Sequence, residues 1–136
     1  FEMRSVFPLG SPAWELNRFW NPVWIRFLGA APPAESTLAH CLLAYASDMG
    51  LVSTATLPHN TTLARDQYQM ASLDHALWIH RPVPLDDWLL FHKRTSTASG
   101  SRGLSHAEFF SRQGELIASV TQEGLMRVSP RTTAPR

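Results

Sequence analysis

Three residue types of a serine-hydrolase triad occur close together at Ser72, Asp74 and His75. Such a triad needs the histidine within hydrogen-bond reach of both the hydroxyl and the carboxylate. The surrounding residues predict a strand, in which successive side chains point to opposite faces. Ser72 and Asp74 would then face one side and His75 the other, which argues against nucleophilic catalysis. The sequence also lacks the Gly-x-Ser-x-Gly elbow and the phosphate-binding Gly-x-x-x-x-Gly-Lys run.

Histidine and cysteine positions give no metal-binding pattern. His75 and His80 are five residues apart in the same predicted strand, so they cannot chelate one ion together without a bend. Cys41 is the single cysteine, which excludes paired thiolate ligands and an internal disulfide. We therefore expect no metal and no cofactor.

A carboxylate stands near the end of a predicted helix. Ser36 is a plausible helix cap ahead of good helix formers, and we expect the helix to run to about Met49, with Gly50 ending it. Apolar residues on nearly every side predict that this helix is buried. Burial of the Asp48 carboxylate would then cost several kcal/mol of folding free energy, unless the carboxylate is paired, hydrogen bonded or protonated.

An amide lies on the apolar side of the last predicted strand. Alternate residues from Leu116 to Met126 are mostly apolar, and Gln122 shares their parity. Buried polar side chains need hydrogen-bond partners. Asp48 and Gln122 can each supply part of what the other needs.

The elements that position these residues predict an α+β domain. We expect a first strand at 22–28, the helix at 36–49, a loop at 53–67, and strands at 69–80, 88–96, 103–112 and 115–128. Gln113-Gly114 predicts a tight hairpin between the last two strands. The prediction is an antiparallel β-sheet, its last four strands forming a meander, wrapped around one central α-helix.

Turn residues predict the domain boundaries, and two tryptophans predict a second sheet. Residues 1–18 carry frequent Pro and Gly, and we expect a linker or strap there without a regular element. The domain would span 19–129, with a tail at 130–136. Trp78 and Trp88 need covering, which predicts a second sheet packed against this one. Because the chain begins at Phe1 and not at a methionine, we expect a piece of a longer protein.

Charge and hydropathy exclude two classes of partner. The chain has 136 residues, with 12 Lys and Arg against 11 Asp and Glu, a formal net charge of +1. Binding a nucleic-acid backbone needs a basic excess, so we expect no nucleic acid. The longest apolar run, near 41–46, is far shorter than the ~20 residues of a membrane span. We expect a soluble domain with no membrane span.

Four short motifs together resemble those of a known family. They are Ala44-Tyr45-Ala46-Ser47-Asp48, the run from Leu73-Asp74-His75 to His80-Arg81-Pro82, Ser101-Arg102-Gly103-Leu104, and Thr121-Gln122-Glu123-Gly124-Leu125-Met126-Arg127. This combination resembles the type II acyl-CoA thioesterases, whose fold is a double hot dog. The likeness extends over about residues 18–128 and looks like the carboxy-terminal hot dog.

The resemblance implies hydrolysis of fatty acyl-CoA to free fatty acid and CoA. In that family an Asp on the central helix, a Thr or Ser on the following strand and a Gln on the last strand hold the hydrolytic water. These positions match Asp48, Ser72 and Gln122. A thioester releases a thiolate, whose thiol has a pKa of about 8.5, so it is a good leaving group. Activation of the water therefore matters more than protonation of the sulfur, and no covalent nucleophile is required. Arg102 and Gly103 are expected at a CoA phosphate, because a guanidinium offers a fork of donors and glycine allows close backbone approach.

Two other functions stay open. In the first, the domain is a non-catalytic acyl-binding or dimer-forming half of a larger protein. The complete set of Asp48, Ser72 and Gln122 argues against this alternative. An acyl-CoA hydratase on a related scaffold would need a histidine a few residues after Asp48, and residues 49–51 contain none.

The expected partners are acyl-CoA and a second hot-dog domain, either in the same chain or in a homodimer. The last residues lack the Ser-Lys-Leu signal of peroxisomal relatives, which favours the cytoplasm.

Overall fold

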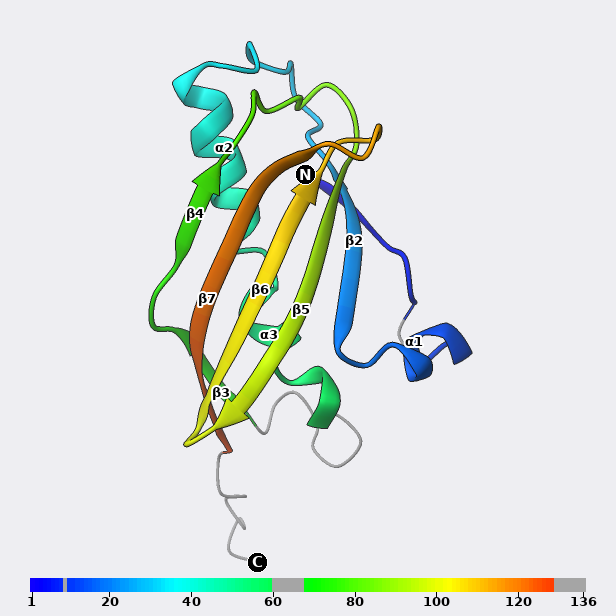
Figure 1. Cartoon of the computed structure of the whole chain (residues 1–136), viewed down its shortest axis with the longest axis vertical. Coiled ribbons are helices and arrows are strands. Elements are labelled where there is room, and N and C mark those ends of the chain that lie inside the picture. Colours follow the sequence, from blue (N-terminus) through cyan, green and yellow to red (C-terminus); the bar gives the residue numbers. More distant parts are fainter. Residues whose placement is uncertain (9, 60–67, 129–136) are drawn as a thin grey trace, which may run out of the picture.

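A seven-stranded antiparallel sheet dominates the computed structural model, which describes residues 1–8, 10–59 and 68–128 (Figure 1). The strand order is β1-β2-β5-β6-β7-β3, and β4 also pairs with β7. The strands are β1 (Glu2–Ser5), β2 (Trp20–Arg26), β3 (Tyr68–Ser72), β4 (Ala76–Ile79), β5 (Leu89–Ser99), β6 (Arg102–Phe110) and β7 (Leu116–Val128).

The three longest strands, β5, β6 and β7, are joined by two tight turns. Gly100 and Ser101 turn β5 into β6 with positive φ angles of 58° and 60°, the left-handed conformation that two-residue hairpins favour. Gly114, with φ of 87°, turns β6 into β7, and the amide of Ser111 donates to the carbonyl of Glu115 at 2.9 Å. The predicted tight hairpin and the three strands predicted beside these turns are confirmed.

The strand predicted at 69–80 is two strands, and its place in the sheet differs from the prediction. β3 and β4 pair with successive parts of β7, whereas a meander would place this segment beside β5. The break falls at 73–75, where the amides of Leu73 and Asp74 both donate to the carbonyl of Glu123. Apolar alternation indicates which face of a strand is buried but not which strand lies beside it. The predicted meander is therefore wrong at its first strand.

The first 18 residues contain regular structure, contrary to the prediction. β1 pairs with β2 and forms one edge of the sheet. A short helix, α1 (Pro12–Leu16), starts after Ser11, whose hydroxyl accepts a hydrogen bond from the Trp14 amide at 3.2 Å. Proline is tolerated at the first helical position because the N–H it lacks would have no partner there. Pro12 thus marks the start of a helix and not a break in structure.

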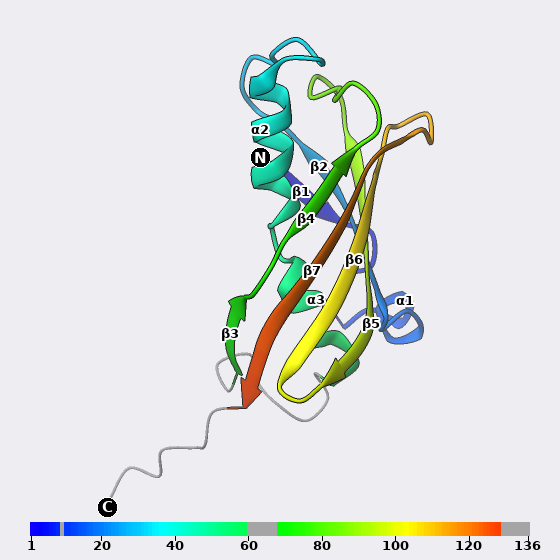
Figure 2. The same ribbon diagram turned by 60° about the vertical axis from the view of Figure 1, so that its left-hand side comes forward.

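The central helix, α2 (Thr37–Ser47), starts as predicted but is covered on one side only. The hydroxyl of Ser36 accepts from the amide of Ala39 at 3.2 Å, which confirms the predicted cap. The buried residues of α2 are Ala39, Leu43, Ala46 and Ser47. Its larger exposed apolar residues, spaced by three and four, are Leu38, Cys41 and Tyr45. The prediction of a wholly buried helix is wrong, because the sheet of this chain lies against one side of α2 (Figure 2).

A short third helix, α3 (Leu51–Thr54), packs closely on β6 and β7, where two glycines face it. Gly103 and Gly124 are directly paired across these strands. A Cβ on Gly103 would lie 2.4 Å from the Cβ of Ala55, and one on Gly124 would lie 2.6 Å from Cγ1 of Val52. Only glycine permits this approach, which fixes α3 just beyond the end of α2.

The predicted loop and tail are only partly described. Residues 53–59 of the predicted loop contain the end of α3 and a 3-10 turn, η1 (Leu57–His59), so that part of the prediction is wrong. Residues 60–67 of the loop and the predicted tail at 130–136 lie outside the described residues.

The hydrophobic core fills the space between the sheet and α2. The rings of Phe91 on β5 and Phe109 on β6 stack with their centroids 4.2 Å apart. Leu43 of α2 and Ile25 of β2 belong to the same buried cluster. An antiparallel sheet curled around a central helix confirms the predicted α+β class (Figures 1 and 2).

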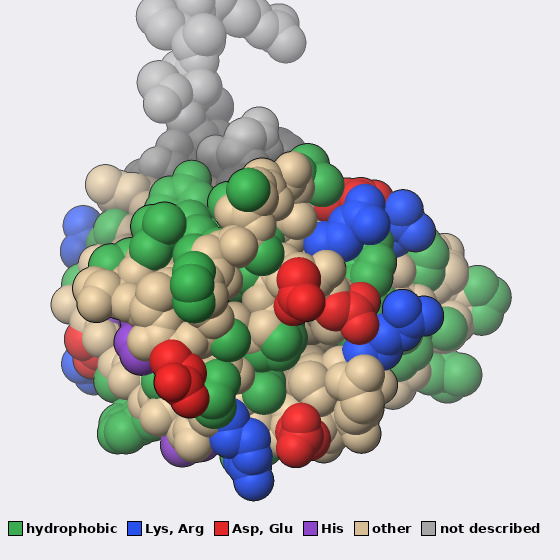
Figure 3. Space-filling view, turned by 90° about the horizontal axis from the view of Figure 1, so that it is seen from above, with side chains coloured by type: hydrophobic (Ala, Val, Ile, Leu, Met, Phe, Trp, Pro, Cys, Tyr) green, Lys and Arg blue, Asp and Glu red, His purple; other side chains and the backbone are tan. Residues whose placement is uncertain are grey.

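The outer surface carries both signs of charge. Seen from above, acidic and basic side chains are interspersed among hydrophobic ones (Figure 3). This mixture agrees with the formal net charge of +1. Within the described ranges, no helix is long and apolar enough to cross a membrane.

Candidate active site

Three side chains that are distant in the sequence meet at one end of α2. Asp48 is the residue that caps α2, Ser72 is the last residue of β3, and Gln122 lies in β7. Nε2 of Gln122 donates to Oδ1 of Asp48 at 2.6 Å and to Oγ of Ser72 at 3.0 Å. Ser72 Oγ also lies 3.5 Å from Asp48 Oδ1. We call Asp48, Ser72 and Gln122 the polar trio.

Gln122 is the buried member of the polar trio, with 1% of its surface exposed. Alternation along β7 turns it inward with Val120 and Met126, as the sequence predicts. Both amide hydrogens point at the other two members. Its Oε1 has no hydrogen-bond partner among the described residues, and neither has the buried hydroxyl of Ser105, directly opposite on β6. The carbonyl side of the amide can therefore accept a further hydrogen bond.

Asp48 and Ser72 are exposed, and this corrects the prediction of an enclosed carboxylate. The helix that carries Asp48 is open on one side, so the end of α2 reaches solvent. A shallow pocket of about 190 Å³ opens here; its lining residues are Asp48, Gly50, Val52, Ser53, Met70, Ala71 and Ser72. Oδ2 of Asp48 has no partner among the described residues, so it can accept a proton or a hydrogen bond from a small molecule in this pocket.

A buried lysine lies behind the same helix end. Lys93 on β5 is 2% exposed, and its Nζ lies 3.5 Å from the carbonyl oxygen of Met49. Burial away from water lowers its pKa from 10.5 to about 8. The ammonium lies 5.0 Å from the centroid of the Phe91 ring. Lys93 was not predicted as a site residue, although it shares the inward parity of Leu89 and Phe91 in the predicted strand.

The two residues predicted to bind a CoA phosphate lie apart from the polar trio. Arg102 is exposed, and its Nε lies 3.6 Å from Oε1 of Glu123. Because Glu123 follows the inward-facing Gln122, Arg102 and Glu123 lie on the outer face of the sheet. Gly103 is buried under Ala55 and Met126, so packing already accounts for a glycine at this position.

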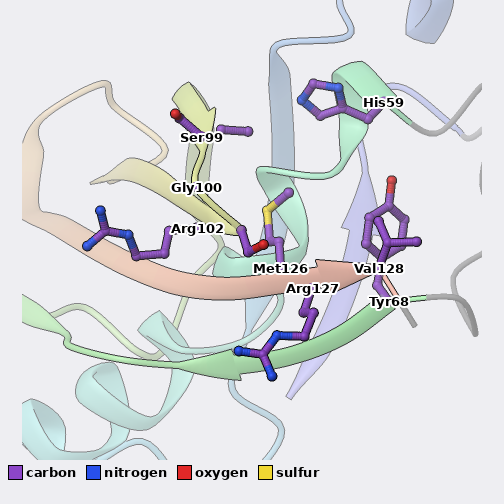
Figure 4. Close-up of a pocket in the computed structure, with 10 residues that line it drawn as sticks. His59, Tyr68, Ser99, Gly100, Arg102, Met126, Arg127 and Val128 are labelled. Carbon is purple, nitrogen blue, oxygen red and sulfur yellow. The ribbon is translucent and has the colours of Figure 1, made fainter. Parts of the chain in front are cut away.

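Arg102 borders a second, larger pocket of about 470 Å³ at the β5–β6 turn (Figure 4). Arg127 and Tyr68 also line it, and Arg102 and Tyr68 lie at opposite ends of the view in Figure 4. None of the polar trio lines this pocket. The phosphate-binding role of Arg102 and Gly103 stays a prediction.

The fold defines the class of this protein, a hot-dog domain, as predicted. The chain is similar to the crystal structure of acyl-CoA thioesterase II TesB2 from Mycobacterium marinum, with a TM-score of 0.78 and 37% sequence identity. The match covers 98% of this chain and 51% of that one.

Sequence comparison gives the family. Residues 17–125 match the family described as Acyl-CoA thioesterase. Acyl-CoA thioesterase 2 of Haemophilus influenzae is 39% identical over 106 residues, 78% of this chain and 37% of that protein. Human acyl-coenzyme A thioesterase 8 is 34% identical over 97% of this chain and 41% of its own length. The chain belongs to the acyl-CoA thioesterase family, and it spans about 40% of the length of these curated relatives.

Proposed function

We propose that this domain hydrolyses fatty acyl-CoA to a free fatty acid and CoA, with Asp48, Ser72 and Gln122 holding the attacking water. The observation that carries the proposal is the bonding of Gln122, whose amide joins the carboxylate and the hydroxyl at the wall of an open pocket. Family membership and the names of the relatives support the thioester substrate.

The proposed reaction needs only groups of this chain and water. Asp48 accepts a proton as the water oxygen forms a bond to the thioester carbonyl carbon. Ser72 and Gln122 fix the carboxylate and the water relative to that carbon, and orientation of this kind is worth up to ~7–11 kcal/mol. A backbone N–H receives the oxyanion. The C–S bond then breaks, and the thiolate takes the proton from Asp48.

A second hot-dog domain is the proposed partner, either in the same longer chain or as a second copy. The exposed side of α2, which carries Leu38, Cys41 and Tyr45, supports this partner. Covering apolar surface removes it from water, which lowers the free energy. The same observation favours the alternative function, in which this domain binds acyl groups or forms a dimer while catalysis depends on the other domain.

Release of CoA thiol, followed with a thiol-reactive dye, tests the proposal. Cys41 is exposed and would react with the dye, so the assay uses a Cys41→Ser background or a chain whose thiol is already blocked. We expect steady release with acyl-CoA, and a loss of about 100-fold or more in Asp48→Asn with the fold unchanged by circular dichroism. Equal rates for Asp48→Asn and its parent would reject the assignment. Acyl-CoA binding without hydrolysis by the parent would support the non-catalytic alternative.

A further inference from the structure

The motif at 72–75 contains two residues that the proposed chemistry does not use. Asp74 and His75 follow Ser72 in the break between β3 and β4. Both are exposed, yet both make short hydrogen bonds to other elements. Their partners are Glu123 and Ser47, each directly beside a member of the polar trio in the sequence.

Asp74 ties this break to β7. Its Oδ1 accepts from the backbone amide of Glu123 at 2.8 Å. The amides of Leu73 and Asp74 donate to the carbonyl of the same residue at 2.9 and 3.4 Å. Both backbone groups of Glu123 are thus held by the segment that follows Ser72. Gln122 is the preceding residue, so its position relative to Ser72 is fixed.

His75 ties the same break to α2. Its Nε2 lies 2.7 Å from Oγ of Ser47, a fully buried residue. The Ser47 hydroxyl donates its one hydrogen to the carbonyl of Ala44, also at 2.7 Å. Since a serine hydroxyl has a single hydrogen, Nε2 of His75 must be the donor to Ser47. Asp48 is the next residue, so this bond fixes the end of α2 relative to Ser72.

We propose that Asp74 and His75 are positioning residues that hold the three elements carrying the polar trio in register; the inference rests on the proposed function for its effect on rate. Neither side chain bonds to the trio directly. One bond anchors β7 beside Gln122, and the other anchors α2 beside Asp48. Because a shift of about 1 Å in a reacting group can cost ~100-fold in rate, loosening either bond should slow hydrolysis.

The molecule offers a matched control on the other face of the sheet. Nε2 of His80 lies 2.9 Å from Oγ of Ser119, so this is a second histidine–serine pair with the same chemistry. Ser119 faces outward because it alternates with the buried Ala118 and Val120. Loss of the His80 bond removes a histidine–serine contact and leaves the hydrogen bonds at the end of α2 unchanged.

The test uses His75→Leu, Ser47→Ala and the double variant that combines these two changes. His80→Leu is the control. We expect His75→Leu to lower kcat by about 10- to 100-fold with KM changed less than about threefold, and His80→Leu to keep the parent kcat. The double variant should be no slower than the slower single variant, because both changes break the same bond between His75 and Ser47. His75→Gln, which places an amide nitrogen near the position of Nε2, should recover most of the rate. Unchanged kcat in His75→Leu, or an equal loss in His80→Leu, would overturn the proposal.

Asp74 has its own pair of variants. Asp74→Ala removes the acceptor for the Glu123 amide, whereas Asp74→Asn keeps an oxygen there. We expect kcat to fall about tenfold or more in the first and to stay within about threefold of the parent in the second, since one lost hydrogen bond is worth about a factor of ten. Equal rates in the two variants would remove Asp74 from the proposal.

Hydrogen exchange separates this inference from the proposed function. An inactive parent would reject the hydrolase, but the anchoring can still be measured on backbone amides. We expect faster exchange at residues 46–50 in His75→Leu and parental exchange there in His80→Leu. Identical exchange in the two variants at 46–50 would show that His75 does not hold the end of α2.

Discussion

Nε2 of Gln122 lies 2.6 Å from Oδ1 of Asp48, although the two residues are 74 positions apart in the sequence. The bond joins the outermost long strand of the β5–β7 hairpins to the end of the central helix. It also links a buried amide to an exposed carboxylate that lines the open pocket.

Replacement of Gln122 by leucine should abolish most of the proposed activity without unfolding the domain. Both donors to Asp48 and Ser72 disappear, and loss of a single well-placed donor typically costs 10²–10³-fold in kcat. The free energy of unfolding should change by less than about 1.5 kcal/mol, because leucine has a similar volume and removes the unpaired Oε1. Thioester hydrolysis and urea unfolding measure the two effects. A variant within threefold of the parent rate would remove Gln122 from the site.

Ser72 offers a finer comparison between alanine and threonine. Alanine removes the oxygen that accepts from Gln122 at 3.0 Å, and we expect a loss of about tenfold or more in rate. Threonine keeps the oxygen, and its methyl group can be accommodated because Ser72 is exposed. Steady-state kinetics on both variants checks the prediction, and similar rates in alanine and threonine would contradict it.

The close approach of α3 predicts an overpacking effect at Gly124. The new Cβ of Gly124→Ala would lie 2.6 Å from Cγ1 of Val52, and we expect destabilisation by about 1–3 kcal/mol. Adding Val52→Ala removes the clashing methyl group and should recover part of the loss, beyond the sum of the two single effects. Thermal or urea unfolding of the two single variants and the double variant measures this coupling. Strictly additive losses would show that the glycine is not needed for the contact.

The only lysine in the sequence predicts a pH dependence of stability. Lys93 has its pKa lowered from 10.5 to about 8 in the folded state, so between these pH values the unfolded chain binds one proton more. The free energy of unfolding should therefore rise with pH across this window, by about 3 kcal/mol in total from this residue. Below pH 8 the burial penalty is fully present.

Lys93→Met isolates that contribution, since methionine fills a similar space without a charge. We expect the variant to be more stable than the parent by about 1–3 kcal/mol at pH 7, and the difference to shrink towards pH 10.5. Urea unfolding of both proteins at pH 7, 8.5 and 10 makes the comparison, with other titrating groups common to both. A constant difference across these pH values would mean that Lys93 is not the group responsible.

Local patterns alone determined much of the fold. The cap at Ser36, the hairpin at Gly114 and the inward parity of Gln122 each depend on neighbouring residues, so they could be predicted from the sequence. Motif resemblance supplied the family, which the comparisons confirm. The start of α1 at Pro12 was missed, because proline spacing alone does not distinguish a helix start from a break.

Which elements lie side by side follows from long-range contacts and not from local sequence patterns. Because β3 and β4 pair with β7 and not with β5, Ser72 lies beside Gln122. The alternation of apolar residues in these strands does not indicate which strands pair. Tertiary structure also exposes Asp48 and one side of α2, because coverage of a helix depends on how much sheet surrounds it. The anchoring bonds of Asp74 and His75 and the burial of Lys93 arise in the same way, from contacts between segments far apart in the chain, which no local periodicity encodes.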